Sequence, residues 1–218
     1  MHWLKIVYYS VLVLALAACI PAYKNRKYFL FIPLIALNIG VEVIREFIEK
    51  PSRLETSILL FQVIAEYSLL SLIIANFLRS LWKRKIIVIS VYTMIPIFII
   101  LQLILIGNNK SYKYLNQMIE APLICAWTTL YLFETARHEE EFNLTSNPMF
   151  WISFGNILFY SGSLFSYGLG SYLESKGNDK AADAIFLIAQ ILNILLYILY
   201  FIGFLCILRS RRLLSSQF

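Results

Sequence analysis

Residues 182–208 read ADAIFLIAQILNILLYILYFIGFLCIL, and this stretch decides the fold class. Its one charged residue is Asp183, close to its start. A transmembrane helix needs about 20 consecutive, mostly apolar residues to cross the hydrocarbon core of a bilayer, whereas a surface helix of a soluble domain keeps a polar face. The stretch therefore predicts a helix that spans a membrane.

Six further apolar blocks of similar length occupy most of the remaining chain, at residues 3–23, 28–47, 56–78, 86–106, 114–133 and 148–172. Only 15% of the 218 residues are charged, against about a quarter in an ordinary soluble domain. Most of these charges fall in the short links between the blocks. The pattern predicts an all-α membrane protein, a single domain over residues 1–218 that forms a bundle of seven transmembrane helices.

The distribution of Lys and Arg predicts the orientation of this bundle. The first, third and fifth links and the C-terminal tail carry more of them than the N-terminus and the other links, and they hold the densest clusters, at 24–27, 83–85 and 209–212. Loops rich in Lys and Arg stay on the cytoplasmic side of a membrane. We therefore expect the N-terminus outside and the C-terminus inside. Basic residues in such links are topology signals, so we expect no nucleic acid as a partner.

The N-terminus resembles a lipoprotein signal, because Lys5 precedes an apolar run that ends in two alanines and Cys19. Lys5 is the only basic residue there apart from His2, the run is long, and six more blocks follow. We therefore expect a retained first helix. Cys19, Cys125 and Cys206 all lie inside apolar blocks without a CxxC pair, which favours reduced, buried thiols.

Three acidic residues, Glu42, Glu66 and Glu120, lie well inside the predicted spans and not at their ends. An ionisable side chain near the bilayer centre costs about 2.5–3.5 kcal/mol, so it normally faces the bundle interior or water. With the N-terminus outside, the rise of about 1.5 Å per residue places all three between the outer face and the midplane. Glu66 lies deepest and has no basic neighbour within a helical turn, so we expect it to be protonated or paired from another helix.

Other polar residues reach comparable depths. Arg45 can pair with Glu42 one turn away, and Gln62 lies one turn outside Glu66. The sequence predicts a small-ligand pocket with Glu66 as its polar anchor and a wall of Glu42, Arg45, Glu120, Gln62, Gln190 and Asn193. Two alternatives remain at this stage, since Glu42 and Arg45 also fit an interfacial ion pair, and Gln190 and Asn193 fit hydrogen bonds between helices.

Histidine placement argues against several known seven-helix chemistries. Both histidines, His2 and His138, lie outside the apolar blocks, which speaks against a bis-histidine haem and a three-histidine zinc site. The last block has no lysine for a retinal Schiff base, and no block pairs a nucleophile with a base. We therefore expect no catalytic residues, no metal and no cofactor.

Two local patterns predict helix boundaries and packing. Asn147 before Pro148 is typical of a helix start, because Asn caps the first turn and Pro fits it. Gly162, Ser166 and Gly170 recur at four-residue steps, a pattern that lets two membrane helices approach closely.

The stretch from Asn147 to Gly155 (NPMFWISFG), continuing to Phe159-Tyr160-Ser161-Gly162, resembles the sixth-helix signature of small seven-helix membrane proteins of the Bacteroidota. A lone Glu in the middle of the third helix, here Glu66, resembles the same group. In that group the module stands alone or is similar to the membrane part of sensor histidine kinases. The resemblance implies a receptor-like or accessory role in a bacterial inner membrane.

These observations lead to one functional hypothesis and two alternatives. We expect an integral membrane protein that binds a small ligand in an outer-half pocket and relays to a separate signalling or membrane-complex partner protein. The first alternative is a proton- or cation-coupled small-solute transporter that uses Glu66 as its proton site. The second is a structural subunit of a membrane complex, in which the buried acids serve assembly.

Overall fold

The computed structural model describes residues 2–22, 26–48, 53–106, 114–138 and 144–215. Within these ranges the chain is helical without strands, which confirms the predicted all-α class. The seven α-helices are α1 (His2–Ala22), α2 (Phe31–Glu46), α3 (Arg53–Phe77), α4 (Leu81–Leu101), α5 (Leu115–His138), α6 (Pro148–Ser175) and α7 (Asp179–Ser215). Two 3-10 turns, η1 (Arg26–Tyr28) and η4 (Leu144–Ser146), precede α2 and α6, and a π-helical turn, η2 (Gln102–Ile106), extends α4.

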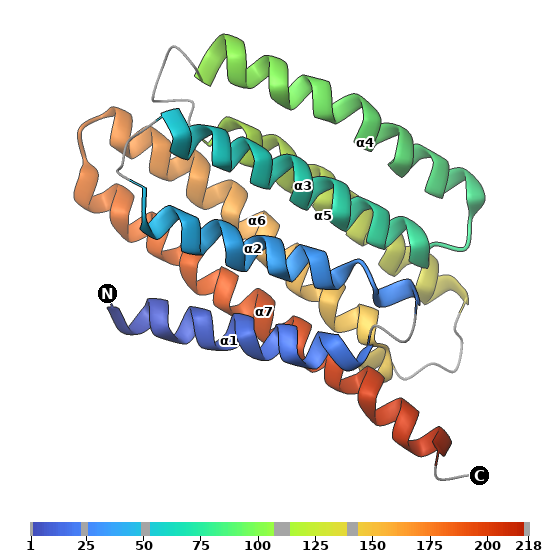
Figure 1. The fold of residues 1–218 in the computed structure, drawn as a ribbon. Helices are drawn as coiled ribbons and strands as arrows, with labels where there is room; N and C mark the ends of the chain where they lie inside the picture. Colours follow the sequence, from blue (N-terminus) through green and yellow to red (C-terminus); the bar gives the residue numbers. More distant parts are fainter. Residues whose placement is uncertain (1, 23–25, 49–52, 107–113, 139–143, 216–218) are drawn as a thin grey trace.

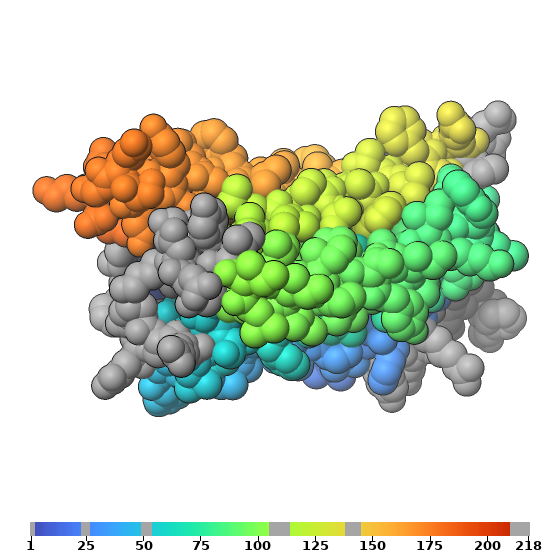
Figure 2. Space-filling view, turned by 90° about the horizontal axis from the view of Figure 1, so that it is seen from above, coloured from blue at the N-terminus to red at the C-terminus, as the bar shows by residue number. Residues whose placement is uncertain are grey.

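Successive helices run in opposite directions along a common axis (Figure 1). The start of α1, the end of α2, the start of α3 and the α6–α7 turn lie at one end of the bundle, on the left of Figure 1. We call this the amino-terminal end. Helices α6 and α7 pack along each other, α1 packs on α7 and α2, and α3 contacts α2, α4 and α5. Helix α4 contacts mainly α3 and lies on the outside of the bundle (Figure 2).

Among the described residues, four helical stretches are long and apolar enough to cross a membrane, namely Trp3–Ala22, Leu54–Phe77, Leu81–Ile104 and Asp179–Arg209. Large apolar side chains such as those of Ile6, Trp82 and Ile89 are exposed on α1 and α4, as contact with lipid requires. The chain thus has the character of an integral membrane protein. Helix α2 has 16 residues and reaches about 24 Å, less than the hydrocarbon core of about 30 Å, so the predicted seven spans stay a prediction.

Two predicted boundaries differ from the structure. The cluster at residues 83–85 was expected in a link, but it lies in the first turns of α4, which begins at Leu81. Likewise α7 runs from Asp179 to Ser215 and includes the basic residues at 209–212. Hydropathy ends a predicted span at the first charges, whereas the helix itself continues because Lys and Arg are good helix formers.

The start of α4 is held by a carboxylate from another helix. Glu134 of α5 accepts hydrogen bonds from the backbone N–H groups of Arg79 (2.5 Å) and Ser80 (3.0 Å) and from Lys83 Nζ (2.7 Å). Burial works against ionisation, but these hydrogen bonds outweigh it and hold the pKa of Glu134 below its ordinary value. Glu134 therefore holds the backbone immediately before α4, at Arg79 and Ser80, where the N-cap residue Ser80 makes no capping hydrogen bond with its own side chain.

The start of α6 confirms the predicted cap. Asn147 has an extended backbone, and its Oδ1 accepts a hydrogen bond from the backbone N–H of Met149 at 3.0 Å, with Pro148 in the first helical position. We expect Asn147→Ala to lower the free energy of unfolding by about 1 kcal/mol, since it removes this cap. Ser80→Ala is the matched control, because Ser80 occupies the N-cap of α4 without a capping side-chain bond. Equal thermal unfolding of the two variants in detergent would contradict the assignment.

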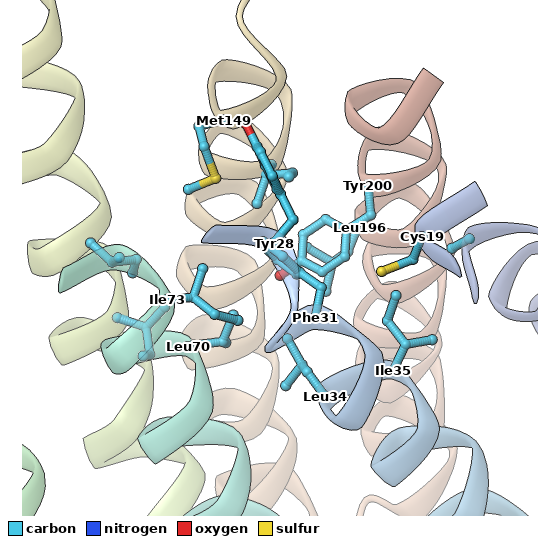
Figure 3. Packing of buried hydrophobic residues seen from close by; sticks show 14 of the residues in the cluster. Cys19, Tyr28, Phe31, Leu34, Ile35, Leu70, Ile73, Met149, Leu196 and Tyr200 are labelled. Atoms are coloured by element: carbon cyan, nitrogen blue, oxygen red, sulfur yellow. The ribbon is translucent and has the colours of Figure 1, made fainter. Parts of the chain in front are cut away.

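Apolar packing concentrates in the half of the bundle away from the amino-terminal end. Figure 3 shows Phe31 and Leu34 of α2, Leu70 of α3 and Tyr200 of α7 packed together there, all at most 2% exposed. Gly170 of α6 is so close to α7 that an added Cβ would lie 2.5 Å from the ring of Phe186. The predicted close approach along Gly162, Ser166 and Gly170 is thus confirmed. The Gly170–Phe186 contact lies near the α6–α7 turn at the amino-terminal end, whereas the apolar cluster of Figure 3 lies in the other half of the bundle.

Candidate functional site

A cavity of about 410 Å³ opens in the amino-terminal half of the bundle. Helices α1, α2, α3, α5, α6 and α7 all contribute to its lining. It is lined by every residue that the sequence analysis assigned to a pocket, namely Glu42, Arg45, Gln62, Glu66, Glu120, Gln190 and Asn193. The volume lies in the range of about 300–1,000 Å³ that small-molecule sites occupy.

Helical periodicity explains why residues far apart in the chain face one space. Asn38, Glu42 and Arg45 follow each other at four and three residues on α2, and Gln62 and Glu66 are four apart on α3. Residues three or four apart share one face of a helix. Each helix therefore presents its polar stripe to the cavity and its apolar residues to neighbouring helices or lipid.

Glu66 forms a hydrogen bond with a residue of another helix. This confirms the expectation that its partner comes from another helix. The hydroxyl of Tyr160 on α6, 94 residues away in the chain, donates a hydrogen bond of 2.8 Å to Glu66 Oε1. In the part of the chain that the structure describes, no basic side chain forms an ion pair with Glu66. The Tyr160 hydroxyl stabilises the Glu66 carboxyl group by this hydrogen bond, but it brings no positive charge to compensate a negative one.

Glu120 on α5 is a buried acidic residue of the lining whose hydrogen bonding is incomplete. It is 3% exposed, and its Oε1 has no hydrogen-bond partner among the described residues. Gln117 Oε1 and Ser163 Oγ, which also line the cavity, share this property. Buried polar atoms almost always have a partner, so these atoms indicate that the cavity takes up water or a polar ligand.

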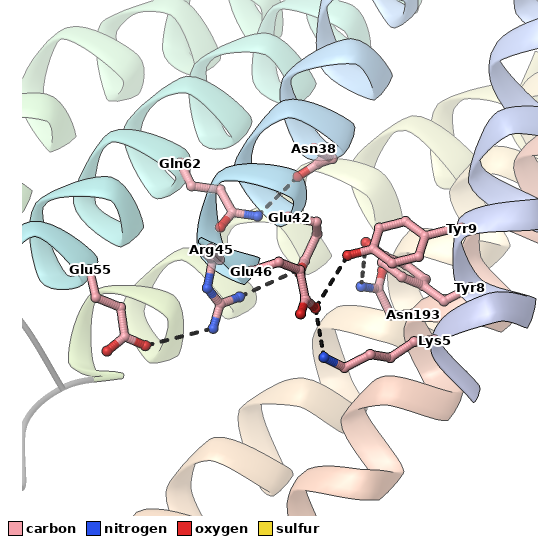
Figure 4. Close-up of polar contacts among 10 residues, drawn as sticks. All are labelled: Lys5, Tyr8, Tyr9, Asn38, Glu42, Arg45, Glu46, Glu55, Gln62 and Asn193. Carbon is pink, nitrogen blue, oxygen red and sulfur yellow. Dashed lines mark hydrogen bonds and ion pairs between the residues drawn. The ribbon is translucent and has the colours of Figure 1, made fainter. Parts of the chain in front are cut away.

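Charged side chains at the rim are already engaged with each other (Figure 4). Lys5 Nζ of α1 lies 2.6 Å from Glu46 Oε1 of α2. Arg45 Nη1 lies 3.4 Å from Glu42 Oε1, which confirms the predicted pair, and Arg45 Nη2 lies 4.0 Å from Glu55 of α3. The two basic residues of the lining are therefore both compensated by acids.

Amide side chains link the walls of the cavity. Gln62 Nε2 donates to Asn38 Oδ1 at 3.0 Å, which joins α3 to α2, and Asn193 Nδ2 donates to the Tyr8 hydroxyl at 3.3 Å, which joins α7 to α1 (Figure 4). For Asn193 the alternative of a hydrogen bond between helices is thus confirmed, although the residue also lines the cavity. Gln190 lines the cavity too but is exposed.

Tyrosines form a part of the lining that the sequence analysis did not assign to the pocket. Six tyrosines line it, namely Tyr8 and Tyr9 of α1, Tyr114 just before α5, Tyr160 and Tyr167 of α6, and Tyr197 of α7. The Tyr114 and Tyr167 rings stack with centroids 4.9 Å apart, and the Tyr8 and Tyr197 rings are tilted at 6.0 Å. The sequence position of two of these tyrosines could have indicated their role. Tyr160 and Tyr167 lie in the interior of an apolar block, whereas the tyrosines of interfacial belts lie at the ends of such blocks.

The lining of the cavity is mixed in chemistry, with polar and aromatic side chains. Among the described residues, no group of three or more His, Cys, Asp or Glu side chains is placed to hold a metal ion. The lining instead combines carboxyl, amide and hydroxyl groups with aromatic rings. Such a surface offers hydrogen bonds, electrostatic contacts and stacking to a ligand.

Comparison with known protein families, with curated proteins and with solved structures finds no match. The resemblance of residues 147–162 to a seven-helix family of the Bacteroidota therefore stays a prediction. In this chain the motif has identifiable structural roles. Asn147 caps α6, Tyr160 donates to Glu66, and an added Cβ at Gly162 would overlap the side chain of Leu192 on α7.

Proposed function

We propose that this chain is a receptor-like protein of a bacterial inner membrane, with seven transmembrane helices, that binds a small ligand in its outer half and relays to a partner protein. One observation carries the proposal: polar side chains from six helices share a single cavity at the amino-terminal end of the bundle. A purely structural bundle gains nothing from placing costly polar groups around an open space.

The charge distribution supports the proposed orientation. Lys27, Arg79 and Arg84 gather at the end of the bundle opposite the cavity, where they line a shallow depression. Lys and Arg accumulate on the cytoplasmic side of membrane proteins. The cavity then faces the periplasm, and a ligand can reach it without crossing the membrane.

Thiol labelling tests this orientation. We expect Lys176→Cys, at the α6–α7 turn, to react with a membrane-impermeant maleimide in spheroplasts made from intact cells. Arg79→Cys, in the link between α3 and α4 where the side chain is exposed, should react only after the membrane is permeabilised. The reverse pattern of labelling would place the cavity on the cytoplasmic side and contradict the proposal.

The architecture gives a physical route for the relay. A ligand in the cavity touches six helices at once, so its binding free energy can favour one arrangement of these helices over another. Helices α6 and α7 pack closely against each other, so we expect them to move as a pair, whereas α1 packs on α7 and α5 packs on α6. A shift of α1 or α5 against α6 and α7 would reach the opposite end of the bundle, where a partner protein can detect it.

Thermal unfolding with a chemically diverse library of small molecules tests ligand binding. We expect some members to raise the melting temperature of the purified protein, and Ser163→Phe to abolish the shift, because Ser163 lines the cavity and is 2% exposed. Ser161→Phe is the matched control, since Ser161 lies on the same helix and is exposed. A library that never shifts the wild type, or shifts all three proteins equally, would refute the pocket.

Transport is the second candidate, and the buried acids favour it. Glu66 and Glu120 both line the cavity and interact electrostatically, an arrangement that suits proton coupling. Uptake of the library hits into proteoliposomes with an imposed pH gradient separates the candidates, since a receptor binds without accumulating its ligand. Co-purification of a stable complex in mild detergent, without any ligand-induced shift, would instead indicate a structural subunit.

A further inference from the structure

The cavity lining carries an excess of acidic side chains. Glu42, Glu46, Glu66, Glu120 and Asp183 line it, against Lys5 and Arg45 as the basic residues. Both basic residues are engaged by acids at the rim, at the Lys5–Glu46 and Arg45–Glu42 contacts. Within the described chain Glu66 and Glu120 form no ion pair, so the deep part of the cavity lacks a cation of its own.

The two deep carboxyl groups are close enough to interact electrostatically. Glu120 is 3% exposed, lines the cavity and has an oxygen, Oε1, with no hydrogen-bond partner among the described residues. A buried carboxylate needs a donor or a positive charge to offset the loss of its hydration. The Tyr160 hydroxyl donates such a hydrogen bond to Glu66. For Glu120 Oε1, a ligand in the cavity would have to supply the donor or the positive charge.

Aromatic rings surround the same space. Six of the fourteen tyrosines of the chain line the cavity, and Phe186 adds its ring beside Tyr114 at a centroid distance of 5.3 Å. The face of an aromatic ring is electrostatically negative and attracts ammonium groups, especially when they are removed from water. Aromatic lining with acidic groups and no free basic residue repels an anion and attracts an organic cation.

A bare metal ion fits this lining poorly. Ca²⁺ and Mg²⁺ require six or more oxygen ligands that converge on one point within about 2.6 Å. The described residues contain no such cluster, and a cavity of about 410 Å³ lined by ring faces is far larger than a metal cage. The volume suits a ligand of several non-hydrogen atoms.

We propose that the cavity binds a small organic cation, an alkylammonium or aralkylammonium compound, whose charged nitrogen lies beside Glu120 and Glu66 and whose apolar part lies against the tyrosine rings. This inference rests on the proposed ligand-binding function and names the class of ligand. The rim pairs of Lys5 and Arg45 with acids leave the entrance free of uncompensated positive charge.

Isosteric probes test the charge requirement directly on the full-length wild type. Choline, its neutral carbon isostere 3,3-dimethyl-1-butanol and the anion 3,3-dimethylbutyrate share a shape and differ in charge. Phenethylamine, 2-phenylethanol and phenylacetate form a second series with a primary ammonium and a ring. We expect the cation of at least one series to bind about 10-fold or more tightly than its neutral partner by isothermal titration at constant ionic strength.

Carboxyl variants then locate the charge. Glu120→Gln keeps the shape of the side chain and should weaken binding of the cation about 10- to 100-fold. Glu66→Gln is a second variant in case Glu120→Gln does not fold. The matched control is Glu174→Gln near the end of α6, where the side chain is exposed and does not line the cavity, so cation affinity should not change.

The outcomes separate this inference from the proposed function. Neutral or anionic probes that bind as tightly as the cations, with binding lost in Ser163→Phe, would overturn the cation inference and support the pocket. Cation binding that survives both Glu120→Gln and Glu66→Gln in folded protein would overturn the assignment of the charged nitrogen. If no probe of any charge class binds, the cation inference is overturned. The proposed pocket is then tested by the thermal shifts measured with the chemical library.

Discussion

Glu134→Gln is expected to lower the free energy of unfolding by about 2–3 kcal/mol, because it breaks a buried carboxylate site at the start of α4. Glu134 is 5% exposed and accepts from the backbone N–H groups of Arg79 and Ser80 and from Lys83. Glutamine keeps the shape but turns an NH₂ group toward one of these donors. It also leaves Lys83 without its counter-charge. Thermal unfolding in a fixed detergent measures the loss.

Glu46→Gln is the matched control for this prediction. The Lys5–Glu46 contact, at 2.6 Å, is as short as the Lys83–Glu134 contact at 2.7 Å. Its side chains are 55% and 45% exposed, so water and salt screen the pair. Exposed pairs contribute about 0–1 kcal/mol, and we expect Glu46→Gln to unfold close to the wild type. Equal losses in the two variants would show that the hydrogen bonds to the α4 start are unimportant.

The stabilisation from Glu134 depends on pH in a defined direction. Its pKa in the folded protein lies below the ordinary value of 4.5, so the unfolded chain binds the proton more readily. The contribution is therefore complete above that ordinary value and is lost as the pH falls through the lower folded pKa. We expect the difference in melting temperature between wild type and Glu134→Gln to shrink as the pH falls from about 6 to about 3. A difference that stays constant over this range would contradict the ionised state of Glu134.

Block length and hydropathy predicted the helices of this fold because a membrane span must be long and apolar. They placed the α6 start correctly, since Asn147-Pro148 encodes its own cap. They placed the α4 start too late, because Glu134, which holds the backbone just before this start, comes from another helix and the first turns of α4 are basic. Helix ends that depend on a distant partner are not encoded locally, so a single sequence does not reveal them.

Site residues were predictable for a related physical reason. Polar groups are rare in hydrocarbon, so Glu42, Glu66 and Glu120 stood out, and their common depth predicted that they lie together. Their partners were not predictable, because Tyr160 and Tyr8 contact Glu66 and Asn193 across helices that are distant in sequence. Depth along the membrane follows from residue number, whereas the neighbours of each helix follow from the packing of the whole bundle.

Gly203→Ala should also lower stability markedly, by about 1–3 kcal/mol, because α7 meets α6 at this position without room for a methyl group. An added Cβ would lie 2.9 Å from the backbone oxygen of Pro148 and 3.1 Å from Ile152 Cγ1. A backbone oxygen at the start of a helix cannot rotate away as a side chain can. The substitution must therefore push α7 away from α6 and open the apolar half of the bundle.

Gly40→Ala makes the same chemical change where it should do no harm. No atom beyond the local helix lies within 4 Å of an added Cβ at Gly40 on α2, and alanine favours a helix over glycine by about 0.5–1 kcal/mol. We therefore expect Gly40→Ala to unfold at or above the melting temperature of the wild type, and Gly203→Ala to unfold below it. Gly203→Ala should also weaken ligand-induced shifts, because α6 and α7 carry cavity residues on the same helices that it separates. If Gly203→Ala matched Gly40→Ala in both measurements, the close contact between α6 and α7 could not be what positions the cavity wall.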